Sequence, residues 1–188
     1  MSILDFISST PFIGKIVFIG GTNLRLIKGI DRFSEDLDFD CNDFSREEFM
    51  AMTDSVLLFL KRSGFRAEIC DTENERKMVN IKGCGFYFPF PMPSDEVLCS
   101  MKISAMLFRK KGRDFYDAMF LLSQSPPDYL FLTERQGIHN LQELKQAASE
   151  AINSVDLNHK KRDFEHLLFN KKNSERILYA GHFFSELK

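Results

Sequence analysis

The chain has 188 residues, 44% of them hydrophobic, which is enough for one domain with a proper core or one domain with a small helical appendage. Its net charge of −2 excludes a global attraction to nucleic acid, so a partner of that kind would have to meet local basic patches. Twenty Phe residues and no Trp predict a core built largely from phenyl rings.

The spacing of the cysteines and the length of the apolar runs argue against zinc-binding, disulfide-bonded, secreted and membrane-spanning proteins. The four cysteines have no C-x-x-C spacing and do not cluster with the four histidines, which argues against zinc and against a disulfide framework. Residues 1–10 lack the basic start of a signal peptide, and no run of 18 apolar residues occurs. We therefore expect a soluble, cytoplasmic protein with reduced thiols and no membrane partner.

The first strong feature along the chain is a strand that runs into a glycine turn. Residues 15–19 read as a buried strand, Gly20, Gly21 and Thr22 follow, and helix-forming residues continue to a stop near Gly29. Without Cβ atoms the glycines let a phosphate approach closely, and successive N–H groups can cradle it. Thr22 can add a hydroxyl donor.

Acidic and apolar residues alternate in the next predicted strand. Period-two alternation turns Asp36, Asp38 and Asp40 to one face and Leu37 and Phe39 into the core. Two carboxylates spaced i, i+2 can hold one or two divalent ions over phosphates at the glycine turn. A glycine pair alone is usually a tight turn, and an Asp-x-Asp is usually a solvated face. Their order, and the lack of a packing reason for the carboxylates, favour the functional interpretation.

Two polar residues precede this strand. An extended backbone turns Arg32 and Ser34 to the same side as the two aspartates. A guanidinium fork and a hydroxyl could therefore join the contacts to a phosphate tail.

The middle of the chain predicts one long helix and several short extended segments. Ser45 and Glu48 form a capping box that opens a helix over residues 46–63, which ends at Gly64. Strand-like composition and turn residues mark the segments that follow: strands over 65–70 and 77–81 joined as a hairpin, and a loop or edge strand over 83–93.

Two helices with charged residues come next, over 94–108 and 114–122, separated by a basic run at 109–113. Lys102 is a cation on an apolar stripe, where a lysine that snorkels to the surface is the ordinary interpretation. Asp114 and Asp117 lie i, i+3 on one helix face. They could cap the helix or pair with neighbouring arginines, and a catalytic role has equal weight.

Beyond residues 126–127 the composition becomes helical. Helices are expected around 139–153, 157–169 and 173–187. We interpret residues 1–122 as a core domain and residues 123–188 as a helical C-terminal subdomain. The basic runs 160–162 and 171–172 are most simply solvated faces, with a nucleic-acid contact as the alternative.

Four sequence blocks carry a resemblance to a known family: Gly20-Gly21-Thr22-x-Leu24, Arg32-x-Ser34-x-Asp36-Leu37-Asp38-Phe39, Lys102-x-x-Ala105 and Arg113-Asp114-x-x-Asp117. With them, the chain resembles the AbiEii/AbiGii-type abortive-infection toxin nucleotidyltransferases of the polymerase-β-like superfamily. The resemblance implies an α+β fold with a polymerase-β-like core, a mixed sheet flanked by helices, and a C-terminal helical subdomain. It also implies an NTP substrate and Mg²⁺ or Mn²⁺.

The resemblance assigns roles to the candidate residues. Asp36 and Asp38 would be catalytic and ligate the metal, and Lys102 would contact a phosphate. One of Asp114 and Asp117 would orient Lys102 or help to activate the acceptor. The nucleotide would be held by Gly20, Gly21, Thr22, Arg32 and Ser34. A third carboxylate of the superfamily has Glu68 as its best candidate here, although a surface glutamate is the simpler interpretation.

The leading functional hypothesis is a nucleotidyltransferase that moves an NMP from NTP to RNA, in particular a tRNA end. It would act as the toxin of a toxin–antitoxin or phage-defence system with a cognate antitoxin. The alternatives keep the chemistry with a protein or small-molecule (aminoglycoside-like) acceptor, or make the chain a catalytically silent binding module of the same fold.

Overall fold

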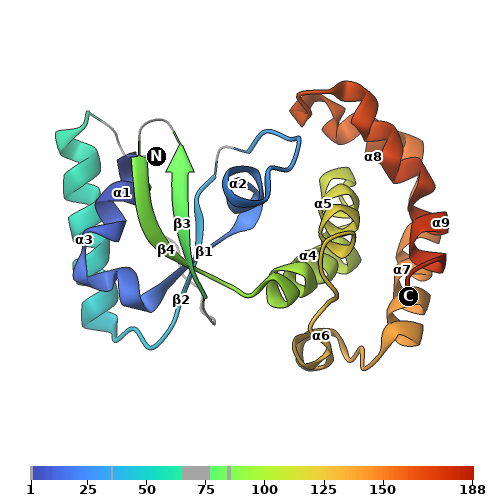
Figure 1. The fold of residues 1–188 in the computed structure, drawn as a ribbon, viewed down its shortest axis with the longest axis horizontal. Helices are drawn as coiled ribbons and strands as arrows, with labels where there is room; N and C mark the ends of the chain where they lie inside the picture. Colours follow the sequence, from blue (N-terminus) through green and yellow to red (C-terminus); the bar gives the residue numbers. More distant parts are fainter. Residues whose placement is uncertain (1, 35, 65–76, 84–85) are drawn as a thin grey trace. The chain divides into compact units, whose positions relative to one another are not determined.

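The computed structural model describes residues 2–34, 36–64, 77–83 and 86–188, with residues 77–83 and 86–90 described by their backbone alone. The chain forms two compact units (Figure 1). The first comprises residues 1–29 and 35–93, and the second comprises residues 30–34 and 94–188. The short segment 30–34 therefore belongs to the second unit although both of its neighbours in the chain belong to the first. The functional boundary expected at residue 122 stays a prediction.

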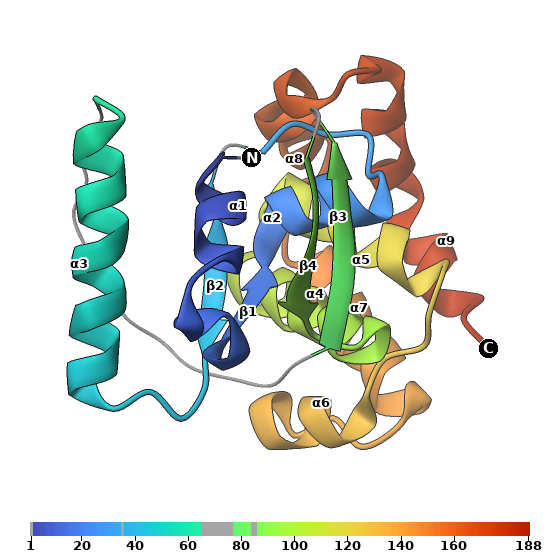
Figure 2. The same ribbon diagram turned by 60° about the vertical axis from the view of Figure 1, so that its left-hand side comes forward.

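The first unit combines short strands with helices. Its described elements are α1 (Ser2–Ser8), η1 (Pro11–Lys15), β1 (Ile16–Ile19), α2 (Gly20–Asn23), the π-helix η2 (Leu24–Lys28), β2 (Asp38–Cys41), α3 (Arg46–Arg62), β3 (Lys77–Gly83) and β4 (Phe86–Met92). Both described strand pairs, β1–β2 and β3–β4, are antiparallel. Helix α1 lies between α3 and the strands (Figures 1 and 2).

Apolar alternation places the core of this unit where the sequence predicts it. Strand β1 is buried along almost its whole length, and Phe18 is fully buried. Leu37 and Phe39 pack against the same core cluster, so their predicted inward orientation is confirmed. The phenyl-rich core is visible in the tilted pair of Phe18 and Phe39, whose ring centroids lie 5.6 Å apart.

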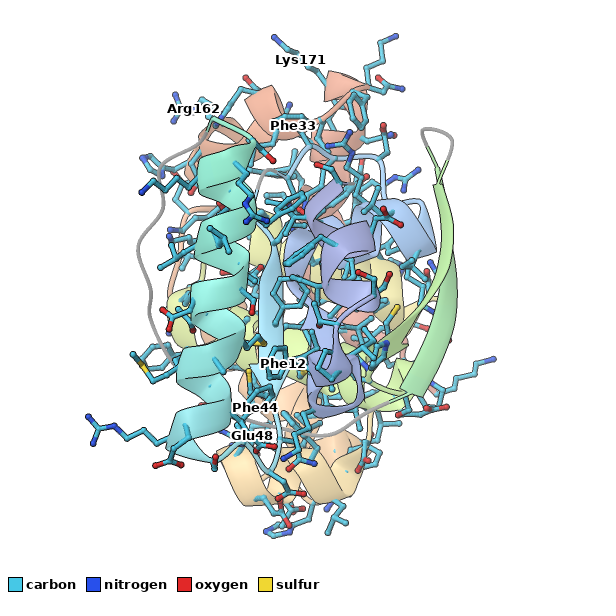
Figure 3. All side chains as sticks on the ribbon, turned by 90° about the vertical axis from the view of Figure 1, so that its left-hand side faces the viewer. Phe12, Phe33, Phe44, Glu48, Arg162 and Lys171 are labelled. Atoms are coloured by element: carbon cyan, nitrogen blue, oxygen red, sulfur yellow. The ribbon has the colours of Figure 1, made fainter. Side chains whose placement is uncertain are left out.

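The capping box predicted for α3 is present. Ser45 Oγ accepts a hydrogen bond from the Glu48 N–H, and Glu48 Oε2 accepts one from the Ser45 N–H. Lys15 Nζ lies 2.5 Å from Glu48 Oε2 and 5.8 Å from the centroid of the Phe44 ring, beside the two labelled residues in Figure 3. The hydrogen bonds from Lys15 and Ser45 lower the pKa of Glu48. These contacts tie the start of α3 to the residue that precedes β1.

The second unit is helical in all of its regular elements. These are α4 (Asp95–Arg109), α5 (Gly112–Leu122), α6 (Tyr129–Gln136), α7 (Leu141–Asn153), α8 (Leu157–Phe164), η3 (Glu165–Leu167), η4 (Lys171–Tyr179) and α9 (Ala180–Ser185). Helix α5 contacts α4, α8, η4 and α9 (Figure 1). None of the helices in the described part of the chain has the length and apolar character needed to span a membrane.

Several segments differ from expectation. Of the loop and the edge strand that the sequence left open over 83–93, the structure has the edge strand: β4 pairs with β3 along its whole length in a two-stranded sheet. The strand expected over 65–70 lies outside the described residues. Helices α1 and α6 were not predicted, although Asp128 caps α6 and Gly137 ends it in the left-handed conformation.

Gly112 sets the approach of α5 to α8. A Cβ atom at this position would lie 1.9 Å from the Lys160 carbonyl oxygen and 2.7 Å from Phe164 Cδ1. A carbonyl of the helix backbone cannot move aside as a flexible side chain would. The start of α5 therefore has to be a glycine for α8 to pack on it.

We expect Gly112→Ala to lower the free energy of unfolding by about 1–3 kcal/mol, because the added methyl group overpacks the contact with α8. The measurement is urea denaturation followed by circular dichroism. Gly181→Ala is the matched control, since a Cβ atom added there would meet nothing within 4 Å and alanine favours helix α9. Equal stabilities for the two variants would contradict this account.

Candidate active site

The pairing of β1 with β2 brings a carboxylate to the glycine turn. In this antiparallel register Ile19, the last residue of β1, is opposite Asp38, the first residue of β2. The next residue along the chain after Ile19 is Gly20. The strand pair therefore places Asp38 beside the point where the chain leaves β1 for the turn.

Gly20 and Asp38 lie in close contact. Gly20 has φ +81°, a left-handed conformation that side chains disfavour, and an added Cβ would lie 1.9 Å from Asp38 Oδ2. The predicted closeness of the glycine turn and the acidic strand is thus present in the first unit.

Two polar atoms at this turn are buried without a hydrogen-bond partner. Thr22 is 7% exposed and Asn23 is fully buried. Asn23 Nδ2 donates to the Phe18 carbonyl at 2.6 Å, whereas Asn23 Oδ1 and Thr22 Oγ1 have no partner among the described residues. Because an unsatisfied buried polar group costs about 1–3 kcal/mol, such atoms fit a polar ligand at the turn. Asn23 was not among the predicted site residues, and its polar character between Thr22 and the buried Leu24 was the available signal.

The two predicted metal ligands are both exposed. Asp36 lies just before β2, so the strand is shorter than the sequence suggested, and Asp38 opens it. Within the described residues no group of three or more His, Cys, Asp or Glu side chains is arranged to hold a metal ion. Within that part of the chain, His, Cys, Asp and Glu would therefore supply a metal with at most two side-chain ligands. Glu68, the third candidate, lies outside it.

A second cluster lies in the second unit, around the buried carboxylate of Asp117. Arg32 Nε donates to Asp117 Oδ1 at 2.6 Å, and an Arg32 terminal nitrogen donates to Oδ2 at 2.7 Å. Arg32 is 3% exposed and Asp117 is 1% exposed. Burial by itself would lower the pKa of Arg32, but the hydrogen bonds and charge of Asp117 outweigh it, so the pKa is raised. The pair is bidentate and buried.

Lys102 shares the same carboxylate. Its Nζ lies 3.3 Å from Asp117 Oδ2, and the residue is 8% exposed, so it does not snorkel to the surface. Of the two predicted candidates for orienting Lys102, Asp117 is the one in contact with it. The structure therefore joins Arg32, Lys102 and Asp117, which lie on segment 30–34, α4 and α5.

Asp114 has the structural contacts, a helix cap and an arginine pair, that the sequence left as the alternative to a catalytic role. It is 1% exposed, and its Oδ1 accepts a hydrogen bond from Arg109 at 2.6 Å. Its Oδ2 accepts one from the Lys111 N–H at the start of α5. Asp114 thus caps α5 and pairs with Arg109. Ser34 lies half-buried at the end of segment 30–34.

Comparisons with known proteins agree with this geometry. Residues 3–92 match the family model described as nucleotidyl transferase AbiEii toxin, type IV TA system. A search of curated protein sequences finds no significant match. A solved structure of a candidate nucleotidyltransferase from Helicobacter pylori matches with a TM-score of 0.54 and 21% identity, covering 99% of this chain and 90% of that one. The nucleotidyltransferase toxin MenT4 of Mycobacterium tuberculosis H37Rv matches with a TM-score of 0.50 and 16% identity, covering 99% and 81%.

These findings define the class of protein. The α+β fold is that of nucleotidyltransferase toxins, and the chain is a nucleotidyltransferase. Residues 3–92, just under half of the chain, match the AbiEii nucleotidyltransferase toxins of type IV toxin–antitoxin systems. The predicted family and fold class are confirmed, whereas the individual roles of the site residues stay predictions.

We expect Asp117→Asn to lower the free energy of unfolding by about 3–5 kcal/mol, because it leaves buried Arg32 and Lys102 without their shared counter-charge. Urea denaturation measures the loss. Asp163→Asn is the control, since its ion pair with Lys160 is partly exposed and spans 4.0 Å, and it should change stability by less than about 1 kcal/mol. A loss for Asp117→Asn no larger than for the control would show that the cluster is not a major source of stability.

Proposed function

We propose that this toxin is a Mg²⁺-dependent enzyme that moves a nucleoside monophosphate from NTP to RNA, with a tRNA end as the acceptor. The observation that carries the proposal is the Asp38 carboxylate held against Gly20 at the glycine turn. A phosphate-binding turn and a metal-binding carboxylate have to lie side by side for this chemistry, and the pairing of β1 with β2 brings Asp38 to Gly20.

The donor set fits Mg²⁺ that arrives with the nucleotide. Mg²⁺ binds hard oxygen ligands, keeps several waters, and commonly takes one or two carboxylates together with substrate phosphates. Asp36 and Asp38 supply two such carboxylates, both open to solvent. When bound, the ion would neutralise charge that develops on the transferred phosphate.

The chain's own groups at the turn would hold the phosphates. Backbone N–H groups at Gly20 and Gly21 are donors, and the absence of a Cβ at Gly20 leaves Asp38 in place. Thr22 Oγ1 is a buried hydroxyl without a partner among the described residues, so it is free to donate to a phosphate oxygen. Burial of these groups would exclude water from one side of the phosphate tail.

The buried charges of the second unit support a phosphate contact for Lys102. Two buried cations, Arg32 and Lys102, share the single carboxylate of Asp117. One positive charge therefore remains for an anion. Asp117 would act as a positioning residue that fixes the Lys102 ammonium, and the bidentate pair with Arg32 would fix the Asp117 carboxylate. In this assignment Asp114 has a structural role at the start of α5.

Membership in a type IV toxin–antitoxin family supports a biological role as the toxin of a two-gene pair, with a cognate antitoxin as its partner. Expression of the active enzyme would then stop growth until the antitoxin relieves it, in the cytoplasm where NTP and tRNA occur.

The direct test is transfer of label from each α-³²P-NTP, with Mg²⁺, to total bacterial RNA. We expect labelled RNA of tRNA size with wild type. Asp38→Asn should lower the rate of transfer at least about a hundredfold, which corresponds to about 2.7 kcal/mol of lost transition-state stabilisation. Asp54→Asn, an exposed carboxylate on α3 of the same unit, should match wild type.

Other outcomes would revise the acceptor or the chemistry. Label on protein alone would make the acceptor a protein hydroxyl, and thermal stabilisation by Mg²⁺ and NTP without any label would indicate a small-molecule acceptor. Neither label nor stabilisation would mean that the fold serves only to bind a partner.

Gly20→Ala tests the contact between the turn and the carboxylate. We expect it to abolish the rise in melting temperature caused by Mg²⁺ with NTP, a stabilisation of about 2.7 kcal/mol when ligand exceeds Kd a hundredfold. Gly29→Ala is the matched control, because Gly29 has φ +69° but a Cβ added to it would meet nothing within 4 Å. If both variants lose the rise equally, backbone strain rather than displacement of Asp38 is responsible.

A further inference from the structure

The basic residues of the second unit divide into paired and unpaired groups. Lys160 Nζ lies 4.0 Å from Asp163, and Lys161 Nζ lies 3.5 Å from Glu175. The side chains of Arg162, Lys171 and Lys172 are exposed, and none has a carboxylate partner in the described ranges. Asp163 and Glu175 are thus each paired with a lysine, whereas these three cations have no such partner among the described residues and carry their charge into solvent.

Two exposed aromatic residues lie among these cations. Phe33 is 38% exposed and Phe169 is 65% exposed. The Phe33 N–H donates to the Leu167 carbonyl at 2.6 Å, which fixes Phe33 next to the chain that leads into Phe169 and η4. Figure 3 shows Phe33, Arg162 and Lys171 at the same end of the second unit.

The segment that carries Phe33 is anchored at three successive residues. Asp31 accepts a hydrogen bond from Asn173 Nδ2, Arg32 forms its bidentate pair with Asp117, and the Phe33 N–H binds Leu167. A partly exposed phenyl ring that is held by its backbone gives up little conformational freedom when another flat ring stacks on it. Exposed aromatic surface beside uncompensated cations is typical of a binding site.

We propose that Phe33, Arg162, Phe169, Lys171 and Lys172 form a docking surface for the single-stranded end of an RNA acceptor. This inference rests on the proposed function, since it assigns where the acceptor of that reaction binds. Unpaired bases stack on aromatic side chains, and the phosphates between them need cations at the spacing of the strand. A base-paired RNA hides its base faces, so it would use the cations without the phenyl rings.

The position of Phe33 in the sequence supports the assignment. It precedes Asp36 by three residues, and three residues span at most about 11 Å of extended chain. The residue on which a base would stack is therefore separated from a predicted metal ligand by only a short stretch of protein chain.

The test measures binding separately from catalysis. A fluorescein-labelled single-stranded 12-nucleotide RNA and the same sequence as a blunt duplex are titrated with protein, without NTP, and followed by fluorescence anisotropy. We expect Phe33→Leu to weaken single-strand binding about tenfold, or ~1.4 kcal/mol, with little effect on duplex binding. Phe33→Tyr, which keeps the ring, should bind as wild type does. Leu130→Ala removes an exposed apolar side chain from α6 and should change nothing.

The cations are tested by salt dependence. Arg162→Gln and Lys171→Gln should each reduce the slope of log K against log salt by about 0.7, whereas Arg135→Gln on α6 should leave it unchanged. Wild-type binding that is no tighter for the single strand than for the duplex, or Phe33→Leu binding like wild type, would overturn the proposal.

The two proposals fail in different ways. Asp38→Asn should bind the single strand normally while losing transfer. If wild type binds the single strand normally but transfers no NMP to RNA, the proposed function is wrong and the docking surface is still supported. If Phe33→Leu leaves transfer unaffected, only the docking surface is wrong.

Discussion

The organisation of the second unit depends on the buried carboxylate of Asp117. One aspartate on α5 holds Lys102 on α4 at 3.3 Å and takes both arms of the Arg32 guanidinium. Two buried cations and one buried anion would each be costly alone, and they are tolerated because each ion is partnered. The same contact binds segment 30–34 to the helical unit. Residues that lie near the acidic strand in the sequence are thereby attached to helices that follow much later in the chain.

Local patterns were enough to predict much of the first unit. Strand β1, the glycine turn, the stop at Gly29 and the capping box of α3 each depend on neighbouring residues, and the structure has all of them. The closeness of Asp38 to Gly20 was also foreseeable, because the apolar residues of two short strands had to share a core, as Phe18 and Phe39 do. The exact register, which places Asp38 opposite Ile19, depends on packing and was not predictable.

Contacts over long sequence separation could not be predicted. The phosphate contact of Arg32 stays a prediction from its place beside the acidic strand, and nothing in a single sequence shows that it pairs with Asp117, 85 residues further on. Strand β4 contains two prolines, which left a loop and an edge strand as alternatives, and the edge position that the structure has tolerates a missing N–H donor. Helix α6 was missed although Asp128 and Gly137 are typical cap residues.

The burial of Arg32 also explains why Phe33 is exposed. Successive side chains of a non-helical segment point in different directions, so a residue drawn into the Asp117 cluster leaves the next one facing outward. The Phe33 backbone is fixed to Leu167 by a hydrogen bond, so its position beside the segment that leads into η4 is set. A net charge of −2 for the whole chain then says little about its partners. Charges that pair within the helices cancel there, and the field of the exposed cations that remain acts on an approaching polyanion over about a Debye length.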